Sequence, residues 1–166
     1  MKKSTLLTIF VWLIVFSLVA CNATKNTAPT WTVENLTQEL NARAEAAGLL
    51  TIPQVATQDF LETKKYNITR GLDLEFRISE SNIIQEATLS CSMFAGKDAA
   101  YANGFYCGNL LAAFAQNEQS VERISTQLDF NNAWTGGEFE RECVDNAITY
   151  RFEFKNNTWA FRITIM

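Results

Sequence analysis

Histidine is absent from this chain of 166 residues. Its absence excludes Ser-His-Asp and Cys-His nucleophile chemistry, general base catalysis by imidazole and most zinc sites. Basic residues are also scarce, since 14 lysines and arginines stand against 18 aspartates and glutamates. This acidic balance argues against a nucleic-acid partner, which requires a basic surface. The sequence holds no Gly-x-Ser-x-Gly elbow, phosphate-binding loop or dinucleotide fingerprint. We therefore predict a protein that is not an enzyme and uses no cofactor.

The first 20 residues have the layout of an export signal. Lys2 and Lys3 form a basic start, and an almost wholly apolar stretch of 15 residues runs from Leu6 to Ala20. A helix that crosses a membrane needs about 20 apolar residues. The stretch therefore suits the core of a cleaved signal peptide better than a permanent anchor.

The stretch ends at residues 18–21, which read Leu-Val-Ala-Cys. Together with the basic start, this run resembles the lipobox of the bacterial lipoprotein class. The resemblance implies a diacylglyceryl group on the Cys21 thiol, cleavage before Cys21 and acylation of the new amino terminus. Asn22 stands where an Asp would imply inner-membrane retention, so the resemblance implies a lipid anchor in the outer membrane of the cell envelope. It covers residues 1–21 alone; an ordinary secretory signal and an uncleaved membrane helix are the alternatives.

We divide the chain into a signal peptide (1–20), a lipidated cysteine with a flexible tether (21–31) and a single globular domain (32–166). The tether residues 22–30 carry no large apolar side chain. Nine such residues reach about 30 Å when extended, so the domain stays close to the membrane. Removal of residues 1–20 leaves 146 residues with 12 basic and 18 acidic side chains, a formal charge of −6.

The first part of the domain predicts a helix over residues 32–48. Thr32 can cap its first turn, and Gly48 can end it in the left-handed conformation. Residues 49–70 have a weaker pattern, in which Ile52-Pro53 could open a short helix that runs to Leu61.

A second helix is predicted over residues 98–116, with Asp98 as its cap. One apolar stripe marks the face expected to pack on the sheet, and its members are Ala100, Gly104, Cys107, Leu111 and Phe114. Residues 120–130 suit either a helix or a strand, and Gly136-Gly137 then breaks the pattern.

Two strands are predicted between these helices, over residues 72–79 and 83–93, because apolar and polar residues alternate in both. A turn centred on Glu80-Ser81 would bring apolar residues opposite one another on one face. The pairs expected from this turn are Ile78 with Ile83, Leu74 with Ala87, and Leu72 with Leu89.

The C-terminal residues predict a β-hairpin with a two-residue turn at Asn156-Asn157, which accepts the positive φ values of a type I′ turn. Arg151 then lies opposite Arg162 on the other face. Residues 138–144 add a strand through a turn at Asp145-Asn146. The apolar pairs expected in the hairpin are Phe154 with Trp159, Phe152 with Phe161, Tyr150 with Ile163, and Ile148 with Ile165.

The predicted element order is α–β–β–α–(α or β)–β–β–β. This order indicates an α+β fold in which an antiparallel sheet of about five strands has helices packed on one face.

Cys91, Cys107 and Cys143 remain once Cys21 carries the lipid. An oxidising compartment favours a disulfide between two of them. We expect a Cys91–Cys107 bond, because both side chains point toward the predicted core; Cys107–Cys143 is the next choice. A redox or nucleophilic thiol is the functional alternative, but the sequence offers neither a Cys-x-x-Cys pair nor a histidine to activate it.

Other charged groups have simple interpretations. Glu138, Glu140 and Glu142 share one face of a strand and could form a cation site or a carboxylate pair for glycoside hydrolysis. We favour the solvated face of an edge strand, with no metal site. Lys64 and Lys65 are too few for a nucleic-acid surface.

The sequence therefore predicts a lipid-anchored envelope protein without catalytic activity, which binds a protein partner as an inhibitor, immunity or accessory module. The alternative is a periplasmic carrier or sensor of a small apolar ligand, held in a pocket lined by Phe152, Phe161 and helix residues. A carboxylate-based hydrolase is the third hypothesis.

Overall fold

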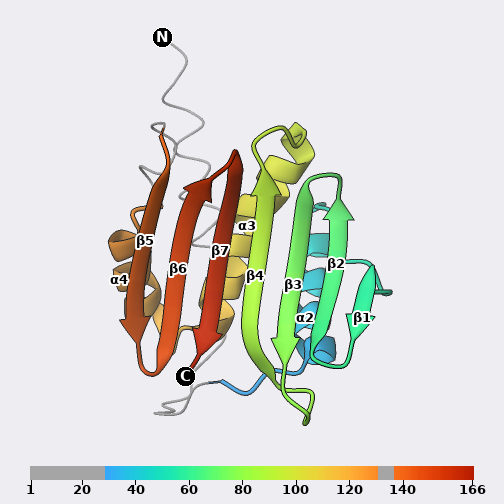
Figure 1. Cartoon of the computed structure of the whole chain (residues 1–166), viewed down its shortest axis with the longest axis horizontal. Coiled ribbons are helices and arrows are strands. Elements are labelled where there is room, and N and C mark those ends of the chain that lie inside the picture. The colour runs from blue at the N-terminus through green and yellow to red at the C-terminus, as the bar shows by residue number, and fades with distance from the viewer. Residues whose placement is uncertain (1–28, 131–136) are drawn as a thin grey trace.

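A computed structural model describes residues 29–130 and 137–166 of the chain. These residues form an α+β fold with three helices and a seven-stranded antiparallel sheet in the order β1-β2-β3-β4-β7-β6-β5 (Figure 1). The prediction of about five strands is wrong by two. The elements are α2 (Val33–Ala46), β1 (Gln58–Phe60), β2 (Thr63–Thr69), β3 (Leu72–Ile78), β4 (Ile84–Ser92), α3 (Lys97–Phe114), α4 (Glu118–Leu128), β5 (Phe139–Asp145), β6 (Ile148–Lys155) and β7 (Thr158–Ile165).

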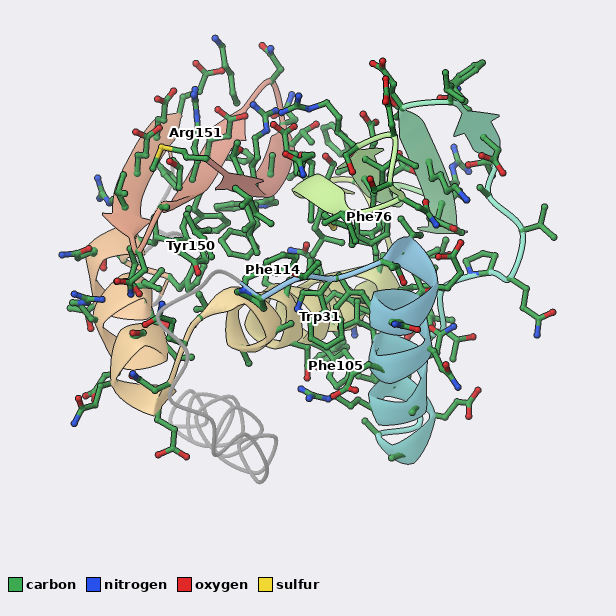
Figure 2. The ribbon with its side chains drawn as sticks, turned by 90° about the horizontal axis from the view of Figure 1, so that it is seen from below. Trp31, Phe76, Phe105, Phe114, Tyr150 and Arg151 are labelled. Atoms are coloured by element: carbon green, nitrogen blue, oxygen red, sulfur yellow. The ribbon has the colours of Figure 1, made fainter. Side chains whose placement is uncertain are left out.

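Two meanders meet at the centre of the sheet, where β4 pairs with β7. Figure 2 shows the ribbons of α2, α3 and α4 on the same side of the sheet, with Tyr150 pointing toward them and Arg151 pointing away. Side chains of the central strands alternate between a buried and a more exposed face, as the pleat of a strand requires. Among the described residues, no helix is long and apolar enough to cross a membrane.

The C-terminal hairpin has the register that the sequence predicts. All four apolar pairs, from Phe154–Trp159 to Ile148–Ile165, are partners in the β6–β7 ladder. Asn156 and Asn157 have φ values of 52° and 59°, as a type I′ turn requires. The strand expected before this hairpin is also present as β5, although its turn lies at Asn146-Ala147, one residue later than predicted.

The β3–β4 register differs from the prediction by two residues. Leu74 pairs with Leu89 rather than Ala87, and Leu72 pairs with Cys91. The connection runs from Ile78 to Ile84 and is longer than a tight turn. Asn82 within it adopts a positive φ of 60°, and the ladder is irregular between Arg77 and Ile78. A shift of two residues keeps Leu72, Leu74, Ala87 and Leu89 on the predicted core face. The predicted pair of Ile78 with Ile83 is wrong, because Ile78 pairs with Ile84, which is buried in place of Ile83.

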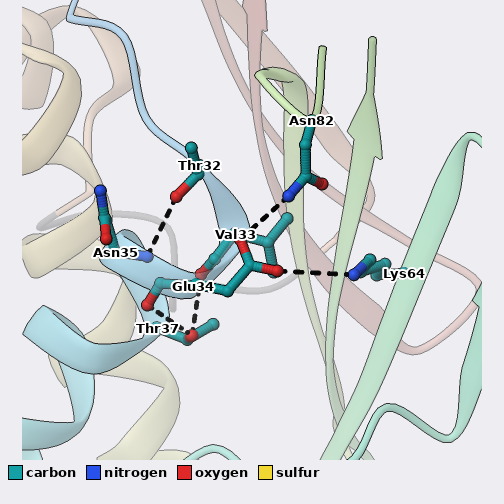
Figure 3. A network of polar contacts seen from close by, with 7 residues as sticks. All are labelled: Thr32, Val33, Glu34, Asn35, Thr37, Lys64 and Asn82. Carbon is teal, nitrogen blue, oxygen red and sulfur yellow. Dashed lines mark hydrogen bonds and ion pairs between the residues drawn. The ribbon is translucent and has the colours of Figure 1, made fainter. Parts of the chain in front are cut away.

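Helix α2 begins and ends where the sequence predicts. The Thr32 hydroxyl accepts a hydrogen bond from the Asn35 N–H at 3.2 Å, and Gly48 follows the helix with a φ of +66°. Figure 3 shows a polar network at its first turn: the Glu34 carboxylate accepts from the Asn82 amide at 3.0 Å and lies 3.6 Å from the Lys64 ammonium. The backbone N–H of Glu34 holds the pKa of its carboxyl below the ordinary value, and Lys64 and Asn82 act in the same direction.

The predicted helix at Ile52–Leu61 is wrong. Asn41 of α2 holds this segment in an irregular path, because its amide bonds both the N–H and the carbonyl of Ile52, at 2.7 and 2.9 Å. The chain then forms β1 and β2, two strands that the sequence pattern does not predict. Lys64 lies on the same face of β2 as the buried Tyr66, so a charged residue interrupts the apolar pattern of that face.

Helix α3 occupies the predicted region but uses a different cap and face. Gly96 is its N-cap, and Asp98 lies within its first turn. The predicted stripe is only partly buried, because the helix is apolar on most sides and its sequence does not select one face. Its buried residues are Ala99, Ala102, Asn103, Tyr106, Asn109, Leu110, Leu111 and Phe114. Residues 120–130, which suited either structure, fall mostly in helix α4.

Candidate functional site

The corner between β4 and α3 is fixed by backbone hydrogen bonds to two neighbouring hairpin turns. The Ser92 N–H donates to the Gly71 carbonyl at 2.7 Å, and the Met93 N–H donates to the Asn157 carbonyl at 2.8 Å. The Ser92 hydroxyl also accepts from the Phe94 N–H at 3.2 Å. These bonds hold the corner in one conformation although it lies outside the sheet.

Large apolar side chains are exposed at this rigid corner. Met93 is 58% exposed, Phe94 is 79% exposed, and Tyr101 of α3 is 54% exposed. We name these three residues the corner patch. Apolar side chains that gather on a surface commonly mark an interaction site, and a fixed backbone lowers the entropy cost of binding through them.

A second exposed apolar group lies around the edge strand β1. It consists of Val55, Phe60 and Leu61, of which Leu61 is 90% exposed. Strand β1 has only three residues and pairs with β2 alone. The corner patch adjoins a pocket lined by Met93, so we take it as the candidate site.

A pocket of about 410 Å³ adjoins the corner patch. Its volume falls within the range of small-molecule sites. The aromatic pair Phe154 and Trp159, with ring centroids 4.3 Å apart, supplies part of its lining. The lining residues are Cys91, Ser92, Met93, Ala95, Ala100, Asn103, Gly137, Phe154, Asn157 and Trp159.

The pocket does not lie where the sequence places it. Phe152 and Phe161 are buried in the core, and Phe130 packs on both rings with centroid distances of 4.6 and 5.4 Å. Phe154 and Trp159, the pair next to the hairpin turn, line the pocket instead. The hairpin therefore packs tightly on the core in its middle and borders open space at its turn.

Asn103 is the least expected member of the pocket lining. The residue is only 6% exposed, and its side-chain amide forms no hydrogen bond within the described part of the chain. Its amide lines the pocket and is not among the fully enclosed side-chain groups that lack a partner, so it can meet water there. By contrast, the amide of the buried Asn109 accepts from Arg43 and donates to the Phe105 carbonyl, both at 2.9 Å. Sequence reasoning missed Asn103 because a polar residue in an apolar helix indicates an exposed position.

The three cysteines of the domain are free thiols in this structure. Cys91 lines the pocket, and burial raises the pKa of its thiol. Burial also raises the pKa of Cys107, and the neighbouring Cys91 acts in the same direction. Helix α3 packs on β4, which brings these two residues near one another. The Cys91–Cys107 disulfide stays a prediction, and protonated thiols of this kind are poor nucleophiles.

Cys143 belongs to a separate polar cluster beneath α4. Burial raises the pKa of its thiol, and the charge of Asp145 adds to the effect. Asp145 is 7% exposed and pairs with Arg123 of α4. Tyr150 is fully buried nearby, and its hydroxyl finds no hydrogen-bond partner in the described part of the chain. The arrangement joins α4 to the sheet, and the sequence gives no sign of it beyond the residue types.

The face of the sheet that carries Arg151 holds a network of ion pairs. Arg151 lies opposite Arg162, as predicted, and acidic neighbours relieve the repulsion. The Arg151 guanidinium lies 2.7 Å from Glu140 and 3.3 Å from Glu153, and Arg162 lies 3.7 Å from Glu86. These pairs leave little unbalanced charge on this face for a charged partner.

Two of the three glutamates singled out from the sequence are engaged in local contacts, and Glu142 is exposed on β5. Glu140 pairs with Arg151, and the Glu138 carboxylate accepts from the Asn156 N–H at 3.1 Å. Within residues 29–130 and 137–166, no group of three or more acidic or cysteine side chains could hold a metal ion. Cys21 lies outside the described residues, so its predicted lipidation stays a prediction. No protein-family model, curated protein or solved structure matches the chain.

Proposed function

We propose that the chain is a lipid-anchored protein of the cell envelope, without catalytic activity, that binds a partner protein through the corner patch. The observation that carries this proposal is the exposure of Met93 and Phe94 on a corner whose backbone is fixed, with Tyr101 exposed on the helix that follows. Aromatic side chains on a rigid support are the residues that most often dominate binding energy at protein interfaces. An inhibitor, immunity or accessory role fits this mode of binding.

The position of the corner patch relative to the start of the domain supports a protein partner. The Ile84 N–H donates to the Trp31 carbonyl at 2.9 Å, and Thr32 bridges Ile83, so the N-terminal segment lies at the start of β4. The corner patch follows the other end of this nine-residue strand, about 30 Å away. Figure 1 shows the two at opposite ends of the sheet. An anchor at Cys21 would therefore enter the domain from the end opposite the patch.

The two faces of the sheet also support the corner as the binding site. We propose that the helices pack on one face of the sheet and that the hydrophobic core lies between this face and the helices. The other face is exposed to solvent, and its residues Arg151 and Arg162 form ion pairs with glutamates of the same sheet. Exposed ion pairs of this kind contribute little to binding, whereas the corner offers exposed apolar area.

Site-specific crosslinking in intact cells tests the proposal. A photoreactive amino acid replaces either Phe94 or Leu61, two apolar residues with 79% and 90% exposure. We expect a discrete protein adduct from Phe94, no such adduct from Leu61, and loss of the Phe94 adduct when Tyr101→Ser is added. An adduct from Leu61 alone, or a Phe94 adduct that is indifferent to Tyr101→Ser, contradicts the proposal.

The lipid anchor needs its own test. Cells that express the chain are labelled with a palmitate analogue, and the protein is compared with its Cys21→Ala variant. We expect label on the unmodified chain alone. Label that persists in Cys21→Ala would contradict lipidation at this residue.

A carrier or sensor of a small apolar ligand is the second candidate function. The pocket beside the corner patch favours it, because about 410 Å³ is enough for a small molecule. Saturable binding of a small apolar probe, lost when Ala100→Phe fills the pocket, would support this function. Ala100 lies at an exposed position of α3, so the larger side chain does not enter the core.

A further inference from the structure

The pocket beside the corner patch has no charged side chain in its lining. Most of its surface is apolar, and the neutral polar side chains are Ser92, Asn103 and Asn157. An ionised group that leaves water must gain a compensating charge or several hydrogen bonds. The pocket therefore disfavours any ligand that buries a carboxylate or an ammonium group there.

Asn103 offers a ligand hydrogen-bonding groups within the mainly apolar pocket. The residue is only 6% exposed, and no described residue forms a hydrogen bond with its side-chain amide. A side-chain amide offers one carbonyl acceptor and two N–H donors. A ligand group that both donates and accepts can therefore form two hydrogen bonds with the Asn103 amide in the pocket.

We infer that this pocket is a binding site for a neutral small molecule with an apolar body and one carboxamide-like group, which pairs with Asn103. The inference rests on the second proposed function and names the ligand class for that site. The apolar body contacts Phe154, Trp159 and Met93, and the amide end reaches Asn103. The ligand then supplies a hydrogen-bond partner to the amide that lines the pocket.

Two matched probes test the ligand class on the full chain in detergent. The probes are 4-phenylbutanamide, which is neutral, and 4-phenylbutanoate, which has the same body and a negative charge at pH 7.5. Binding is followed by the shift of the Trp159 indole N–H resonance, assigned with Trp159→Phe. We expect the amide to bind at least tenfold more tightly than the carboxylate.

Three variants locate the site. Asn103→Leu keeps the side-chain volume and should weaken 4-phenylbutanamide binding at least tenfold, while its melting temperature stays equal or rises. Ala100→Phe should abolish binding of both probes. Gly108→Phe is the matched control, because it adds the same side chain to α3 at a position where a Cβ atom meets nothing within 4 Å.

Each other result overturns a defined part of the account. Equal binding of the two probes, or amide binding that Asn103→Leu leaves unchanged, overturns the ligand class while the ligand-binding function stands. Saturable binding that survives Ala100→Phe overturns the location. Failure of both probes to bind the unmodified chain overturns the ligand-binding function together with the inference.

Discussion

Two fully buried tyrosines give opposite predictions for the same chemical change. The hydroxyl of Tyr106 donates to the Leu50 carbonyl at 2.7 Å, whereas the hydroxyl of Tyr150 has no hydrogen-bond partner among residues 29–130 and 137–166. Both residues have 0% exposure. Replacement of each by Phe removes one oxygen atom and leaves the packed ring in place. We expect Tyr106→Phe to lower the free energy of unfolding and Tyr150→Phe to raise it.

The magnitudes follow from the two environments. Loss of a buried hydrogen bond costs about 0.5–1.5 kcal/mol, and the Leu50 carbonyl can recover a water because Leu50 is 37% exposed. An unsatisfied buried hydroxyl costs about 1–3 kcal/mol, so its removal should stabilise the fold by up to that amount. The two variants should therefore differ from each other by about 1.5–4.5 kcal/mol.

Thermal unfolding in a mild detergent, followed by near-ultraviolet circular dichroism, measures the difference. For a domain of this size, 1 kcal/mol corresponds to about 3–5 °C in melting temperature. We expect Tyr106→Phe to melt several degrees below the unmodified protein and Tyr150→Phe to melt above it. Equal destabilisation by the two variants would refute the reasoning, because it would show that the Tyr150 hydroxyl has a partner.

Three further predictions concern helix α3 and its neighbours. Gly108→Ala should raise the free energy of unfolding by about 0.5–1 kcal/mol in a chemical denaturation series, since its Cβ meets nothing within 4 Å; a loss of stability contradicts this. Burial raises the pKa of Tyr106 to about 12, so the contribution of this residue to stability should be full below pH 10 and be lost as the pH rises to 12; Tyr106→Phe should lose less stability than the unmodified chain over this interval. Non-reducing peptide mapping of protein from the envelope should link Cys91 to Cys107, a closure that stabilises by roughly 3 kcal/mol; a Cys107–Cys143 peptide contradicts the pairing.

The C-terminal hairpin could be predicted in detail from the sequence alone. Four apolar pairs alternate with polar residues on both sides of Asn156-Asn157, and only one register buries all of them. A two-residue turn fixes which residues of the two strands lie opposite each other. The β3–β4 pair lacked such a turn, so the same alternation gave the correct face and a register shifted by two residues.

The first two strands were missed for a different reason. In β2, Lys64 occupies a position on the core face, where its ammonium pairs with Glu34 of α2. The partner lies 30 residues away in the sequence, so no local pattern reveals that the charge is accommodated. Strand β1 has only three residues and all are exposed, which leaves no periodic signal.

The candidate site was the least predictable part. The sequence suggested a pocket near Phe152 and Phe161, but Phe130 fills that position and the open space lies at Phe154 and Trp159. The burial of Asn103 follows from the way α3 lies on β4, a tertiary arrangement that an apolar helix does not encode in its own periodicity.

The affinity of the partner captured at Phe94 tests the central claim most directly. The crosslinked protein is identified and purified, and its dissociation constant is measured for the unmodified chain, Phe94→Ala and the control Leu61→Ala. If the corner patch is the binding site, Phe94→Ala should cost about 2 kcal/mol or more, roughly a 30-fold loss of affinity, and Leu61→Ala should change little. Equal affinity for the unmodified chain and Phe94→Ala would contradict the account.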